Sequence, residues 1–176
     1  MRVLIECAMV TQMARQQGTT RVLDDAKDKI REFTGLGPTK ERLLKGIQKL
    51  SIPPRIKDHM RNMLTGRIKG GAFWNKVQGH GNRAFRSVCK KRQNIEVIET
   101  EEHLWLECSN SGQAQAWKFT KRIWRKTTNR NWPIITMGLI RGAAALSFEK
   151  DTSNDSERLR TLISMKISMS HMEIKN

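Results

Sequence analysis

The sequence predicts a mostly α-helical protein, and two observations carry this prediction. Apolar residues recur at spacings of three and four along most of the 176 residues, which is the period of an amphipathic helix. Sustained alternation of apolar and polar residues, which indicates a half-buried strand, is hard to find. A chain of this length buries roughly 70% of its unfolded surface, so we expect one small helical domain rather than two full-size ones.

Three helices are expected in the first part of the chain. Apolar residues over 22–33 form the first, and the glycines and proline of 35–38 end it. Thr39 is the expected N-cap of the second helix, which has its apolar face over 43–50. Two prolines then end that helix and start a third over 56–64, since proline is tolerated in a first helical turn.

The second part of the chain is less regular. We expect an irregular, basic stretch over 79–94, and then the strongest helical pattern over 113–130. A shorter apolar segment covers 137–148, a polar linker covers 151–156, and a final helix begins at Leu159. A helical wheel over 113–130 separates an apolar arc from a basic arc made of Lys118, Lys121, Arg122, Arg125 and Lys126.

These elements divide the chain into three parts. Residues 1–20 are an N-terminal arm, and 21–150 are a helical domain that contains the irregular, zinc-knuckle-like insertion. Residues 151–176 are the linker and a truncated C-terminal helix. No signal peptide or membrane span is apparent, because the apolar run at the N-terminus is broken by Glu6 and the run that starts at Met137 is stopped by Arg141.

Composition limits the classes of partner. The chain has 33 Lys and Arg against 17 Asp and Glu, a net charge of +16, which favours polyanions: nucleic acid first, acidic membrane surfaces second. Three cysteines are too few, and odd in number, for a disulfide framework, so we expect an intracellular protein, nuclear or cytoplasmic, that is not secreted. We expect RNA or DNA as the partner, and neither a membrane nor a small-molecule substrate.

The positive charge is concentrated in one stretch. Eleven basic residues between Arg55 and Arg92 face a single acid, Asp58, and the acidic segment 96–107 follows without any Lys or Arg. A solvated helix face with a charged loop is the alternative to a binding surface. The candidate nucleic-acid-binding residues, from this stretch and from the basic arc, are Arg55, Arg61, Arg67, Lys69, Arg83, Arg86, Lys90, Lys91, Arg92, Lys118, Arg122 and Arg125.

Cys89, His103 and Cys108 have a spacing that suggests a metal site. His-x4-Cys is half of a zinc knuckle, and a structural zinc ion takes four ligands in a tetrahedron. A fourth ligand would come from His80, Glu99 or water. The alternative is that both cysteines are small buried apolar residues and that His103 is a helix-start or core residue.

The order of several motifs resembles the zinc-binding region at the carboxyl end of non-LTR retrotransposon reverse transcriptases, especially the fungal forms. The matching pieces are Gly71-Ala72-Phe73-Trp74, the Cys89 region, the segment from Glu99 to Cys108, Ala116-Trp117, Trp132-Pro133 and the segment from Met137 to Gly142. The resemblance implies an all-α module with a zinc knuckle that contacts nucleic acid beside an upstream polymerase domain. It also implies that Cys89, His103 and Cys108 are zinc ligands, whereas Arg92 stands where the pattern has its second cysteine.

We expect no catalytic activity. Asp24-Asp25 superficially resembles the paired-aspartate box of a reverse transcriptase, but no aspartate precedes it to complete a metal site, and acids are favoured at a helix start in any case. An RNase H site needs a strand-rich fold. The sequence therefore predicts a non-catalytic nucleic-acid-binding module, a fragment or relic of an element, with a structural or protein-interaction helical domain as the alternative.

Overall fold

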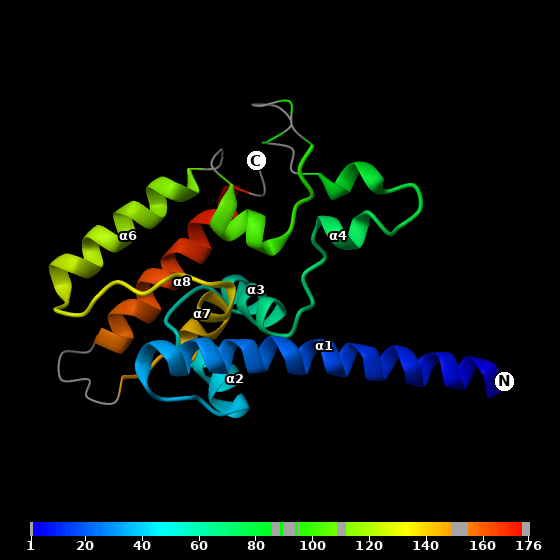
Figure 1. Cartoon of the computed structure of the whole chain (residues 1–176), viewed down its shortest axis with the longest axis horizontal. Coiled ribbons are helices and arrows are strands. Elements are labelled where there is room, and N and C mark those ends of the chain that lie inside the picture. The colour runs from blue at the N-terminus through cyan, green and yellow to red at the C-terminus, as the bar shows by residue number, and fades with distance from the viewer. Residues whose placement is uncertain are drawn as a thin grey trace.

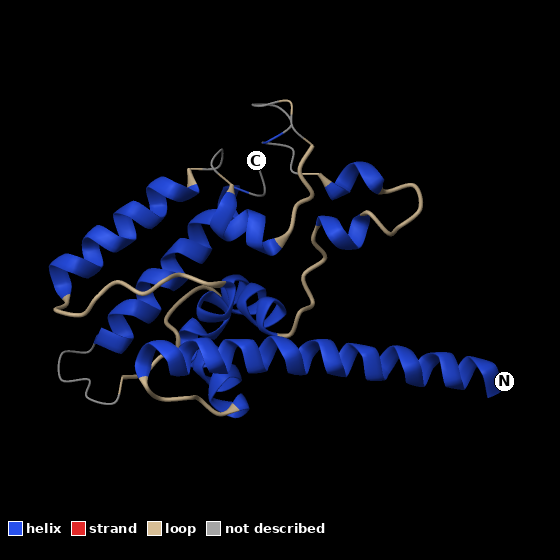
Figure 2. Cartoon of the chain, viewed as in Figure 1, coloured by secondary structure: helices blue, strands red, loops and turns tan. Residues whose placement is uncertain are grey.

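The described part of the chain is mostly helical, as the sequence predicts. The computed structural model describes residues 2–85, 89, 94, 96–108, 112–148 and 155–173, and in these ranges it contains no strand, only an isolated antiparallel bridge between Phe85 and Ile98 (Figure 2). Its elements are α1 (Arg2–Thr34), α2 (Lys40–Lys49), α3 (Pro54–Leu64), α4 (Gly71–Trp74), the 3-10 turn η1 (Gly81–Ala84), the π-helix η2 (His103–Glu107), α6 (Gln113–Thr127), α7 (Met137–Gly142), the 3-10 turn η3 (Ala143–Ala145) and α8 (Asp155–Glu173).

Local side-chain chemistry explains where several helices begin. Thr39 caps α2, because its side-chain oxygen accepts a hydrogen bond from the Arg42 backbone N–H at 3.1 Å, as predicted. Pro54 occupies the first turn of α3, where its missing N–H costs nothing. Thr136 caps α7 in the same way as Thr39 caps α2, accepting from the Leu139 N–H at 3.2 Å.

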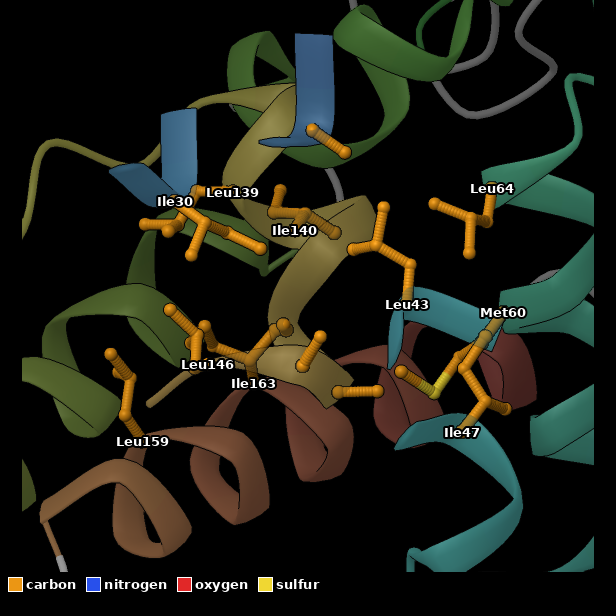
Figure 3. Close-up of a cluster of buried hydrophobic side chains, with 14 of the residues drawn as sticks. Ile30, Leu43, Ile47, Met60, Leu64, Leu139, Ile140, Leu146, Leu159 and Ile163 are labelled. Atoms are coloured by element: carbon orange, nitrogen blue, oxygen red, sulfur yellow. The ribbon is translucent and has the colours of Figure 1, made fainter. Parts of the chain in front are cut away.

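The core lies where α1, α2, α3, α7, η3 and α8 meet, and Figure 3 shows apolar side chains from α1, α2, α3, α7 and α8, and from Leu146 directly after η3, pointing into it. Small residues let the backbones approach closely. A Cβ on Gly138 would lie 2.9 Å from the Asp25 carbonyl oxygen of α1, and one on Gly142 would lie 2.4 Å from Ile30 Cδ1. The short helix α7 therefore packs directly against α1.

Both ends of the chain differ in detail from the sequence prediction. The arm 1–20 is part of α1, which runs without a break from Arg2 to Thr34 and projects beyond the other helices (Figure 1). The final helix begins at Asp155, four residues before Leu159, and residues 151–154 of the expected linker lie outside the described ranges. Leu159 and Ile163 are fully buried, so α8 belongs to the same core as residues 21–148.

Asp155 and Ser156 fix the start of α8. The Asp155 carboxylate, 3% exposed, pairs with Arg130 Nε at 3.0 Å, and the Phe148 backbone N–H donates to Ser156 Oγ at 2.9 Å.

Across the described ranges, no helix combines the length and apolar character needed to cross a membrane.

Candidate metal centre

The three residues with metal-ligand spacing meet in space. Cys89 Sγ lies 3.4 Å from His103 Nε2 and 3.5 Å from Cys108 Sγ, and the three ligand atoms all lie within 4.8 Å of one another. Both cysteines are free thiols and buried, and the His103 side chain is 12% exposed. His103 and Cys108 follow Cys89 by 14 and 19 positions in the chain, and the three form one compact cluster, here called the ligand cluster.

The π-helix η2 brings His103 and Cys108 to the same side. The Cys108 backbone N–H donates to the His103 carbonyl oxygen at 2.9 Å, an i to i+5 bond that closes a wider turn than an α-helix does. In an α-helix, residues five apart point about 140° away from each other. Thr100 holds the start of this turn, because its Oγ1 accepts from the His103 N–H at 3.0 Å.

The geometry is compatible with zinc. A tetrahedral ion with Zn–S bonds of about 2.3 Å and Zn–N bonds of about 2.0–2.1 Å spaces its ligand atoms about 3.5–3.8 Å apart. The two separations from Cys89 Sγ, 3.4 and 3.5 Å, are close to this spacing. Among the described residues, no further cysteine, histidine or carboxylate joins the cluster, so neither His80 nor Glu99 does. Three protein ligands would leave the fourth position of a zinc ion open to another donor.

A second layer of contacts surrounds the histidine and supports η2. Glu107 Oε2 lies 3.6 Å from His103 Nδ1, the ring nitrogen that faces away from the thiols. This separation is longer than a hydrogen bond, so Glu107 is a charged neighbour of the ring nitrogen that the metal would not use. Trp105 is completely buried, and its carbonyl oxygen accepts from Trp117 Nε1 of α6 at 2.9 Å. The ligand cluster is therefore attached to the rigid part of the fold.

Backbone contacts place the α4–η1 segment against the chain that leads into η2. The Gly71 N–H donates to the Glu99 carbonyl oxygen at 2.6 Å, and the Glu99 N–H donates to the Ala84 carbonyl oxygen at 2.8 Å. A Cβ on Gly71 would lie only 2.0 Å from that Ala84 oxygen. The glycine that opens the Gly-x-x-Trp element is thus required by a close backbone approach.

Replacing Gly71 with alanine should destabilise this segment by about 1–3 kcal/mol, because the added methyl group meets backbone atoms that cannot move aside cheaply. Urea unfolding and amide hydrogen exchange of residues 71–85 would measure the effect. Gly81→Ala is the matched control, since a Cβ there meets no atom within 4 Å. Equal stability of the two variants would contradict the close approach.

The predicted nucleic-acid-binding residues that the structure describes are spread over several elements. Arg55 and Arg61 lie on α3, Arg67 and Lys69 follow it, and Arg83 lies in η1, whereas Lys118, Arg122 and Arg125 form an exposed stripe along α6. Figure 1 places α4 and α6 at opposite sides of the molecule, so the basic residues of the α4–η1 segment and those of α6 do not form one patch. Arg61 pairs with Asp58 at 2.6 Å. The remaining predicted residues, Arg86, Lys90, Lys91 and Arg92, lie outside the described ranges.

The paired aspartates of α1 are engaged in ion pairs. Asp24 lies 3.6 Å from Lys27 and 3.8 Å from Lys40, and Asp25 lies 3.8 Å from Arg141, which also binds Glu101. These contacts join α1 to α2 and to α7.

The aromatic residues divide into core and surface. Trp124 is fully buried, and Trp74 is half-buried with Arg83 over its ring. Sequence reasoning missed Phe73, which is 43% exposed beside Lys69. Its position next to Trp74 in a stretch without acids was the available signal.

Comparison of the chain with protein-family models, with curated proteins and with solved structures found no match. A functional assignment therefore depends on the ligand cluster and the basic surfaces.

Proposed function

We propose that the protein is a non-catalytic nucleic-acid-binding module in which Cys89, His103 and Cys108 hold a structural zinc ion. The observation that carries the proposal is the convergence of these three ligands beside a strongly basic, acid-poor segment of the chain. The resemblance to the carboxyl-end region of retrotransposon reverse transcriptases supports the same assignment, with an upstream polymerase domain as a further proposed partner.

The role of the metal in this proposal is structural. Zinc at the ligand cluster would tie Cys89 to η2, and so connect the basic segment before it to the helical core. A structural zinc site contributes folding free energy directly, because the assembled ligands are absent from the unfolded chain. Both thiols would bind as thiolates, and His103 would bind through Nε2 while Nδ1 faces Glu107.

Binding to nucleic acid would be driven by charge. Lysine and arginine side chains that neutralise phosphates release condensed counterions, so affinity falls steeply as salt rises. For roughly 6–10 phosphate contacts, the expected loss is about 10³–10⁵ in affinity between about 50 and 200 mM salt. Lys118, Arg122 and Arg125 lie in register for such contacts, because they recur at i, i+4 and i+7 on the exposed face of α6.

The proposal is tested by neutralising the α6 stripe. The triple variant Lys118→Gln, Arg122→Gln and Arg125→Gln should reduce the slope of log K against log salt by about 2–3, measured by fluorescence anisotropy with a labelled oligonucleotide. The matched control neutralises Arg42, Lys45 and Lys49, which form a similar exposed stripe on α2 and change the net charge equally. Binding of the unmodified protein that does not respond to salt would reject the proposed function.

A protein-interaction module is the second candidate. A groove of about 260 Å³ lies between α6 and α8, with Ile123 and Leu162 among its lining residues, and Ile134 is 89% exposed nearby in the chain. Unchanged oligonucleotide affinity in both triple variants would favour this alternative.

A further inference from the structure

Two cation–aromatic contacts distinguish the surface of the α4–η1 segment, which stands at the side of the helical body (Figure 1). Lys69 Nζ lies 5.3 Å from the centre of the Phe73 ring, and Arg83 Cζ lies 5.2 Å from the centre of the Trp74 ring. The two rings meet edge to face, with centroids 5.1 Å apart. We call Lys69, Phe73, Trp74 and Arg83 the aromatic platform.

The two rings of the platform differ in freedom. Trp74 is held in place, because its indole N–H donates to the Lys69 carbonyl oxygen at 3.1 Å and its ring meets His80 edge to face at 5.8 Å. Phe73 is 43% exposed, although a phenylalanine has no polar atom that gains from contact with water. An exposed ring supported by a fixed indole and flanked by cations is the arrangement that stacks on a nucleic-acid base.

The charges around the platform are divided between its two sides. No acidic residue occurs between Asp58 and Glu96, so Lys69, Lys76 and Arg83 are not neutralised along the chain. On the other side, Phe73 borders a hollow of about 550 Å³ that is also lined by Glu99, Glu101 and Glu102. The ring therefore has Lys69 beside it, and it borders a hollow whose charged residues are mostly acidic.

We infer that the aromatic platform binds single-stranded nucleic acid, with an unpaired base stacked on Phe73 and its phosphates against Lys69 and Arg83. This inference rests on the proposed nucleic-acid function and assigns it a substrate class. The Lys69 side chain is exposed and unbranched, so it can turn from the ring to a phosphate when a base takes its place.

A duplex does not fit this surface as well as a single strand does. The bases of a duplex are stacked on one another and do not offer a free face to a protein ring. A duplex also carries two phosphate backbones, and one of them would approach the carboxylates beside Phe73. Stacking accepts any base, because every base has an aromatic face, so we expect little dependence on sequence.

The test is Phe73→Leu, which keeps apolar bulk and removes the aromatic face. Affinity for a labelled oligothymidine, and for the RNA oligouridine of equal length, should fall by about 5- to 150-fold at fixed salt. Affinity for a DNA duplex should change less than about twofold, and the salt slope should stay the same, because no phosphate contact is removed. Phe73→Tyr should restore single-strand binding, since the ring returns.

Phe119→Leu is the matched control. Phe119 is 50% exposed on α6, with Arg122 Cζ 5.6 Å from its ring centre, but it lies far from the platform. Single-strand affinity in Phe73→Leu equal to that of the unmodified protein, or a loss only in Phe119→Leu, would overturn the inference and leave the proposed function intact. Absence of salt-dependent binding to any oligonucleotide in the unmodified protein would instead reject both.

Discussion

Removing the proposed zinc ion from the purified protein should lower its melting temperature by about 8–16 °C. An ion bound only by the folded state, at a free concentration about 1,000-fold above its dissociation constant, stabilises that state by about 4 kcal/mol. For a chain of this size, each kcal/mol corresponds to about 2–4 °C. Calorimetry with and without a chelator, together with metal analysis of the protein as purified, gives the measurement.

The cysteines of the chain provide the control for this experiment. Cys108→Ser removes a thiolate from the ligand cluster, so the variant should melt at the lower temperature and no longer respond to the chelator. Cys7→Ser should behave as the unmodified protein, because Cys7 lies in α1 and does not belong to the ligand cluster. A chelator response that survives in Cys108→Ser would place the metal elsewhere.

Replacing Trp124 with alanine should reduce the free energy of unfolding by about 3–5 kcal/mol. The side chain is completely buried, its indole N–H donates to the Arg130 carbonyl oxygen at 2.9 Å, and its ring meets Trp132 edge to face. Truncation leaves a large cavity and an unsatisfied carbonyl. Since domains of this kind have total stabilities of about 5–15 kcal/mol, the variant should be close to unfolding.

Two further variants separate the causes of this loss. Trp124→Phe keeps much of the volume and loses the hydrogen bond, so urea unfolding should show a smaller decrease than for alanine. Phe119→Ala on the same helix removes a half-exposed ring and should change stability by less than about 1 kcal/mol. A similar loss in Phe119→Ala and Trp124→Ala would mean that burial does not determine the cost.

The helical class and most helix positions follow from the sequence, because periodicity and capping act locally. Thr39 and the prolines at the start of α3 predicted helix starts that the structure confirms. The helical arm is not apparent in the same way, since residues 3–10 are apolar on every side except at Glu6 and so define no face. The packing of α7 on α1 is also not predictable from the sequence, because the need for glycine at position 138 depends on how closely Asp25 and Lys29 of α1 approach it.

The sequence predicts which residues form the candidate site, but it does not predict how they are arranged in space. The spacing of His103 and Cys108 identified both, but no local rule states that Cys89 comes within 3.5 Å of Cys108. The basic residues were grouped because they share a charge sign, whereas helix directions separate α6 from the α4–η1 segment. Phe73 was missed because exposure of a phenylalanine depends on what packs beside it, which sequence pattern does not encode.

The i to i+5 bond between His103 and Cys108 also determines how this protein tolerates changes in chain length. Deleting one residue between the two would turn this i to i+5 hydrogen bond into an i to i+4 bond, and the segment would close as an ordinary α-helical turn. Every residue from Leu104 to Glu107 would then point in a new direction, and Trp105 would leave the core together with the bond to Trp117. The ligand cluster and the packing of Trp105 therefore both depend on the number of residues in this segment, so a single deletion would disrupt both together.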